Sequence, residues 1–129
     1  MLEIFIMGKP GAKGIRRLIN ATKYSAKGFV AGWKNEEAFR EEVVVAIILT
    51  PAAFFVGSTP LEILFLITMI WLLMVTEALN SAVEAAIDRI GDEWNELSGR
   101  AKDLGSLAVL FVTILNIAAW VTLFCVNCL

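Results

Sequence analysis

Three long stretches of this sequence contain no charged residue, at positions 43–61, 63–76 and 104–126. The last of them has 23 residues, which is enough for an α-helix to cross about 30 Å of membrane hydrocarbon. A chain of 129 residues with 58% hydrophobic residues is also too apolar for an ordinary soluble domain. We therefore expect an all-α membrane protein that forms one domain over residues 1–129 and crosses the membrane three times.

Local signals predict where the membrane helices begin and end. Asn35 is expected to cap a first membrane helix at about 36–57, because asparagine accepts hydrogen bonds from the first turn of a helix. Thr59, Pro60 and Glu62 form a capping box with proline at the first helical position, and Gly91 is a stop signal. These residues predict a second membrane helix at about 60–90. A polar connection at 92–103 then leads to a third membrane helix at about 104–126.

The basic residues are concentrated near the start of the chain, since residues 1–42 hold 8 of the 11 lysines and arginines. Over about 15–34, apolar residues recur at helical spacing and basic residues fill the opposite side, which predicts an amphipathic helix on the membrane surface. Residues 8–14 are rich in glycine but lack the spacing of a phosphate-binding loop, so we expect a flexible linker there. Because cytoplasmic flanks are rich in lysine and arginine, the N-terminal segment and the 89–102 connection are expected in the cytoplasm.

Four polar residues follow the second uncharged stretch at helical spacing. Glu77, Asn80, Glu84 and Asp88 are separated by 3, 4 and 4 positions, so they share one stripe of a helix. Ionisable groups at the margin of a membrane helix indicate a functional site, and the alternative is a solvated face of a helix that leaves the membrane. The sequence has no histidine, which excludes histidine-based catalysis and metal binding.

Two classes of function are compatible with carboxylates in this position. Transfer of a phosphoryl group needs positioning and charge stabilisation, and magnesium is bound through one or two carboxylates together with phosphate oxygens. A small oligomeric channel or transport subunit would also place carboxylates on inward helix faces. Phosphoryl transfer is favoured over a channel, because the acidic residues gather at one interface beside a cationic surface helix and do not line the whole span.

The run EALNSAVEAAIDRIGDEWNELSGRAKDLGS at 77–106 resembles the signature of the small prokaryotic integral-membrane diacylglycerol kinases. The resemblance extends to RRLINATKYSAKG at 16–28 and NEEAFREE at 35–42, and covers about residues 16–126. It implies a homotrimer of three-helix subunits in the bacterial inner membrane, with the active site at the cytoplasmic face. Such an enzyme transfers the γ-phosphate of MgATP to the primary hydroxyl of diacylglycerol and gives phosphatidic acid.

A sister group of that family phosphorylates undecaprenol, which is the alternative acceptor. The segment SGRAKDLGS at 98–106 is similar to the diacylglycerol branch. Ala26 and Asn95 depart from the family pattern, because related sequences often have Trp and His at these positions.

The resemblance also implies roles for individual residues. Glu77 is similar to the catalytic base, and Glu36 and Glu84 are similar to the carboxylates that hold magnesium. Glu77, Asn80 and Ser106 are similar to the residues that contact the lipid acceptor. The positions that resemble nucleotide-contacting residues are Arg17, Tyr24, Glu36, Glu84, Glu93, Trp94, Asn95, Lys102 and Asp103.

Overall fold

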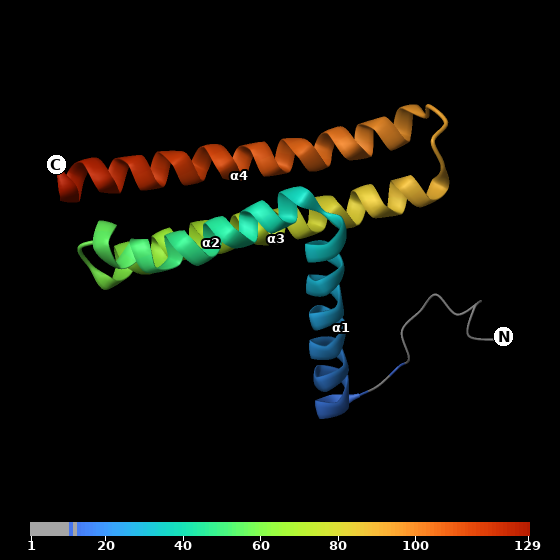
Figure 1. Ribbon diagram of the computed structural model, residues 1–129, viewed down its shortest axis with the longest axis horizontal. Helices are drawn as coiled ribbons and strands as arrows, with labels where there is room; N and C mark the ends of the chain where they lie inside the picture. Colours follow the sequence, from blue (N-terminus) through green and yellow to red (C-terminus); the bar gives the residue numbers. More distant parts are fainter. Residues whose placement is uncertain (1–10, 12) are drawn as a thin grey trace.

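The computed structural model describes residues 11 and 13–129, so most of the predicted linker at 8–14 lies outside the described residues. It contains four helices, α1 (Gly14–Asn35), α2 (Glu37–Val56), α3 (Pro60–Ile90) and α4 (Glu96–Cys128). Helices α2, α3 and α4 lie along one another, while α1 extends away from them at a steep angle (Figure 1). The all-α prediction is confirmed, and the first three predicted helices agree with the structure to within one residue at each end.

The prediction that Asn35 caps the second helix is wrong. Asn35 is the last residue of α1, and its side-chain amide donates a hydrogen bond to the carbonyl of Ala31 at 2.9 Å. The backbone N–H of Glu36 still donates to the carbonyl of Gly32 at 2.9 Å, so α1 continues one residue further than expected. Glu36 therefore occupies the N-cap position of α2, in an extended backbone conformation.

Contacts across the corner hold α1 against the start of α2. The guanidinium of Arg40 donates to the carbonyl of Trp33 at 2.9 Å, which satisfies one of the carbonyls that the end of a helix leaves unpaired. The ring of Phe39 covers Gly32 so closely that a Cβ at that glycine would lie 3.0 Å from two ring atoms. Phe29 packs edge-on against the same ring, with centroids 5.5 Å apart. The corner that carries Glu36 is therefore closely packed.

The turn between α2 and α3 follows the predicted cap. The hydroxyl of Thr59 accepts from the N–H of Glu62 at 3.2 Å, and the Glu62 carboxylate accepts from the N–H and the hydroxyl of Ser58, each at 2.8 Å. The amide of Asn127 donates to Glu62 at 3.0 Å and to the carbonyl of Val56 at 2.9 Å. These bonds fasten the end of α4 to the α2–α3 turn.

Helix α4 begins eight residues earlier than predicted. The side chain of Asn95 accepts hydrogen bonds from the N–H groups of Leu97 at 2.9 Å and Ser98 at 3.1 Å, and so acts as the N-cap. The predicted polar connection at 92–103 is therefore mostly helical, and Gly91, with φ of 144°, ends α3 as expected. Lys102 and Asp103 consequently have fixed positions on a helix.

Within the described part of the chain, two helices, α3 and α4, are long and apolar enough to cross a membrane. Helix α2 carries Arg40 and three glutamates in its first six residues, so its uncharged part is shorter. Asn116 is the one buried residue of α4, and its amide donates to the carbonyl of Met69 in α3 at 2.8 Å. The two helices are thus joined by a hydrogen bond within their apolar stretches.

We expect Gly57→Ala to destabilise the fold. A Cβ at this position would lie 2.7 Å from Cγ1 and 2.9 Å from the backbone nitrogen of Ile63, so the turn would have to open, at a cost of about 1–3 kcal/mol. Gly28→Ala is the matched control, because nothing lies within 4 Å of a Cβ there and alanine favours helix. Thermal unfolding in detergent micelles measures both, and equal unfolding temperatures for the two variants would contradict the expectation.

Candidate functional site

The centre of the site is a buried carboxylate in the middle of α3. Glu77 is 5% exposed, and one turn further along the helix Asn80 is 8% exposed. The carboxylates of Glu36, Glu42 and Glu84 all lie close enough to repel the negative charge of Glu77. The start of α2 and the second half of α3 therefore bring four carboxylates into one region.

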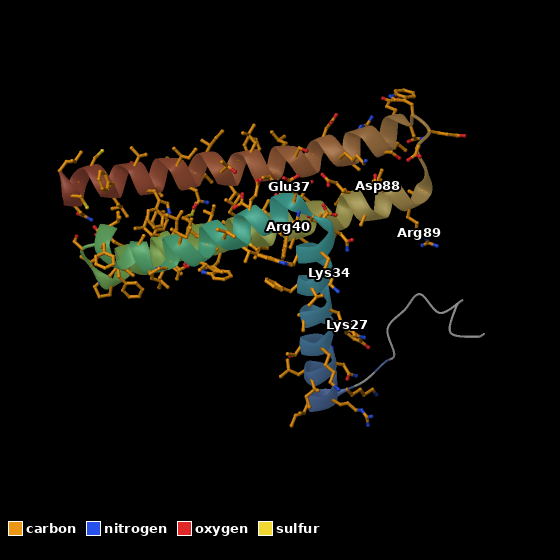
Figure 2. The ribbon with its side chains drawn as sticks, in the orientation of Figure 1. Lys27, Lys34, Glu37, Arg40, Asp88 and Arg89 are labelled. Carbon is orange, nitrogen blue, oxygen red and sulfur yellow. The ribbon has the colours of Figure 1, made fainter. Side chains whose placement is uncertain are left out.

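The predicted stripe continues along α3 toward its C-terminal end. The amide of Asn80 donates to Oε1 of Glu84 at 3.2 Å, while Oδ1 of Asn80 is buried with no partner among the described residues. Further along, Asp88 accepts from the ammonium of Lys102 in α4 at 2.6 Å. Figure 2 shows Asp88 on the side of α3 that faces α4, whereas Arg89 points away from it.

The alternative of a solvated face fits only part of this stripe. Asp88 is exposed, but Glu77 and Asn80 are buried against neighbouring helices. Burial of a carboxylate and an amide costs free energy of folding, and such groups in membrane helices usually mark functional sites, so these two residues favour the functional interpretation.

A pocket of about 630 Å³ lies among α1, α2 and α3, beside the carboxylates. Glu36 lines it together with mainly apolar or small residues, including Phe29, Phe39 and Ala82. The hydroxyl of Ser81, also in the lining, is buried without a partner in the described part of the chain. The pocket has room for an apolar group next to a carboxylate.

Glu36 and Glu84 lie near Glu77, and the other residues predicted to contact a nucleotide fall into two separate groups. One group surrounds the α3–α4 connection, where Trp94, Asn95 and Asp103 line a pocket of about 440 Å³. Glu93 shares with Trp94 and Asn95 the lining of a second pocket of about 750 Å³. Lys102 lies on the same part of α4, and Ser106, one turn further along, is exposed.

The other group lies on α1 and does not meet the first within one chain. Arg17 is in the first turn of α1, at the end away from α2, and Tyr24 follows two turns later. Because α1 extends away from α4, neither residue is brought near Lys102 (Figure 1). The lysines of α1, such as Lys27 and Lys34, project from this outlying helix (Figure 2).

Two residues of the site were not predicted from the sequence. The carboxylate of Glu42, which lies on α2, repels the carboxylate of Glu77. Gly105 of α4 lies against Asn80. Glu42 is the last charged residue before the uncharged stretch 43–61, which is a usable signal for a carboxylate at the membrane boundary. Gly105 has no comparable signal, because its role depends on how closely α3 and α4 approach.

Glu36 and Glu84 are the predicted magnesium ligands. Among the described residues, no group of three or more acidic or cysteine side chains is arranged to hold a metal ion. Glu36 and Glu84 nevertheless lie near the same residue, Glu77. Two carboxylates fit magnesium that is bound mainly by phosphate oxygens and water, as in many phosphoryl-transfer sites.

Comparison with known proteins agrees with these features. Residues 23–124 match the family model described as prokaryotic diacylglycerol kinase. A protein of Haemophilus influenzae named diacylglycerol kinase is 50% identical over 107 residues, which cover 83% of this chain and 91% of the relative. Proteins of the same name from Escherichia coli K12 and Pseudomonas aeruginosa are 46% and 38% identical, over 83% and 88% of this chain and 88% and 92% of their own lengths. The chain belongs to the prokaryotic diacylglycerol kinase family.

Proposed function

We propose that this chain transfers the γ-phosphate of MgATP to the primary hydroxyl of diacylglycerol, giving phosphatidic acid, at the carboxylates around Glu77. The observation that carries the proposal is the burial of Glu77, at 5% exposure, as the one charged residue of α3 between Glu62 and Glu84. An apolar pocket of about 630 Å³ beside Glu36 offers space for the lipid part of the acceptor. The site thus combines an apolar environment with groups suited to phosphate chemistry.

Glu77 acts as the base in this proposal. It accepts the proton of the lipid hydroxyl as the hydroxyl oxygen bonds to the γ-phosphorus, while the bond between that phosphorus and the bridging oxygen breaks and ADP leaves. The protein contributes mainly positioning and charge stabilisation to such a reaction. Asn80 and Ser106 are proposed to contact the diacylglycerol acceptor.

The remaining polar residues are assigned to MgATP. Glu36 and Glu84 would hold magnesium, which neutralises charge on the β- and γ-phosphates when bound. The ammonium of Lys102, which forms an ion pair with Asp88 at 2.6 Å, would contact phosphate oxygens directly. The other residues proposed to contact the nucleotide are Arg17, Tyr24, Glu93, Trp94, Asn95 and Asp103.

We further propose that α2 is the third membrane crossing and that the site faces the cytoplasm. The end of α3 and the start of α4 lie at one end of the bundle, and the start of α2, where α1 joins it, lies partway along α3 toward that end (Figure 1). The lysines and arginines are concentrated in α1 and in these segments. Such a charge distribution is typical of cytoplasmic flanks. It supports a multi-pass protein of the bacterial inner membrane.

The purified chain in mixed micelles tests the proposed activity. ATP-dependent phosphate transfer is measured with diacylglycerol and undecaprenol in parallel. We expect phosphatidic acid with the first acceptor and little product with the second. Preference for undecaprenol would reassign the substrate, and absence of transfer to either lipid would reject the proposed function.

We predict that Glu77→Gln lowers kcat by at least about 100-fold, because the amide cannot accept the hydroxyl proton. The half-saturating concentration of MgATP should change little, since the base acts on the lipid. Glu37→Gln is the control, as Glu37 is an exposed glutamate in the first turn of α2 (Figure 2). Equal losses of nucleotide affinity and rate in Glu77→Gln would instead assign Glu77 to the metal.

Magnesium dependence separates the proposed metal ligands from the proposed phosphate contact. Glu36→Ala and Glu84→Ala should each weaken activity in a way that extra magnesium partly restores, because mass action offsets a weakened site. Extra magnesium should not restore the activity of Lys102→Ala, since the metal cannot replace a missing ammonium that contacts phosphate. A magnesium titration of each variant, with the exposed Glu41→Ala as control, makes the comparison. Wild-type magnesium dependence in both glutamate variants would withdraw the metal assignment.

We also propose that the chain is a homotrimer. Within one chain, large apolar side chains are exposed along α2, α3 and α4, and Glu36, Glu42 and Glu84 are only partly buried. Association of copies would cover more of this surface, and three copies are expected on family grounds. Cross-linking in mild detergent should give trimers that retain activity, whereas a fully active monomer would contradict this.

A further inference from the structure

Gly105 of α4 lies directly against the side chain of Asn80 in α3. A Cβ at residue 105 would overlap Oδ1 of Asn80 and would lie 3.3 Å from its Cγ. Asn80 is 8% exposed, so its amide is enclosed where the two helices meet. The amide occupies the space that any larger residue at position 105 would need.

The backbone does not explain a glycine at this position. Residue 105 lies in the interior of α4, and the glycines with positive φ in the described chain are Gly14 and Gly91. Alanine favours helix over glycine, so glycine is the poorer choice for the helix alone. The physical requirement seen for glycine at 105 is the space that it leaves for Asn80.

The orientation of the Asn80 amide matters for its neighbours. Its Nδ2 donates to Oε1 of Glu84 at 3.2 Å, which holds that carboxylate in place. Its Oδ1 is buried and has no partner among the described residues, although a buried acceptor normally has one. The position of this amide is therefore set by its hydrogen bond to Glu84 and by the space that Gly105 leaves for its oxygen.

We propose that Gly105 is a positioning residue, because it leaves the space in which the Asn80 amide stays bonded to Glu84. This inference rests on the proposed function of the Glu77 region. A methyl group at 105 would push the end of the Asn80 side chain aside while the helices remain packed. Glu84 would then lose its hydrogen bond, and both the acceptor side and the magnesium side of the site would be displaced.

The test compares Gly105→Ala with Gly99→Ala. Both glycines lie in α4, both changes add one methyl group, and a Cβ at 99 would have nothing within 4 Å. We expect Gly105→Ala to lower kcat by about 10-fold or more, because small displacements of reacting groups are costly. Its half-saturating magnesium concentration should rise. Gly99 shares a pocket with Trp94 and Asn95, so Gly99→Ala is the control for stability only. The kinetic control is Ala108→Ser, a change at an exposed position of α4 outside the pockets described above, which should stay within about two-fold of the wild type in both quantities.

A second measurement separates positioning from a general packing defect. In an Asn80→Ala background no amide can be displaced, so Gly105→Ala should raise the unfolding temperature in micelles about as much as Gly99→Ala does. In the wild-type background, Gly105→Ala should lack this gain. Equal effects of Gly105→Ala on the unfolding temperature in both backgrounds would overturn the inference, because the contact with Asn80 would then not matter.

The kinetic outcomes also distinguish this inference from the proposed function. If Gly105→Ala retains wild-type kcat and magnesium dependence, the positioning role is rejected while the kinase activity stands. If the wild-type chain transfers no phosphate to diacylglycerol, the proposed function and the role resting on it both fail. The stability comparison then reports only whether Gly105 and Asn80 are coupled in the fold.

Discussion

The burial of Glu77 is the constraint on which the rest of the structure depends. Removing a carboxylate from water costs several kcal/mol, and here the carboxylates of Glu36, Glu42 and Glu84 add repulsion. A fold selected only for stability would place apolar residues at this position. The helices instead converge to hold the carboxylate in place, which is expected where charge is used to bind or to transfer a proton.

The fold could be predicted where the signals lie within a few consecutive residues. Thr59, Pro60 and Gly91 define both ends of α3, because caps and stops act through bonds to their immediate neighbours. The cap at Asn95 is equally local, but the start of α4 was placed at the first uncharged residue and was therefore wrong. The prediction for Asn35 is wrong for a different reason: its side-chain amide donates to a carbonyl within α1, which extends through Asn35 and leaves Glu36 as the N-cap of α2.

The site could be predicted in part, because helical spacing alone places Glu77, Asn80 and Glu84 on one side of α3. Glu42 and Gly105 could not be assigned in this way. Their importance arises from the approach of α2 and α4 to α3, and spacing within one helix carries no information about such approaches. The sequence therefore predicts which groups are present, while helix packing determines which of them interact.

Two sets of residues proposed to contact the nucleotide, those on α1 and those around the α3–α4 connection, do not meet within one chain. Arg17 is at the free end of α1, Lys102 is near the start of α4, and α1 extends away from α4 (Figure 1). Helix α4 buries only Asn116, so its apolar surface must be covered by lipid or by protein. A second copy packed on α4 would cover part of this surface and could bring its own α1 toward Lys102. Assembly would then complete the nucleotide site, so that activity would depend on oligomerisation.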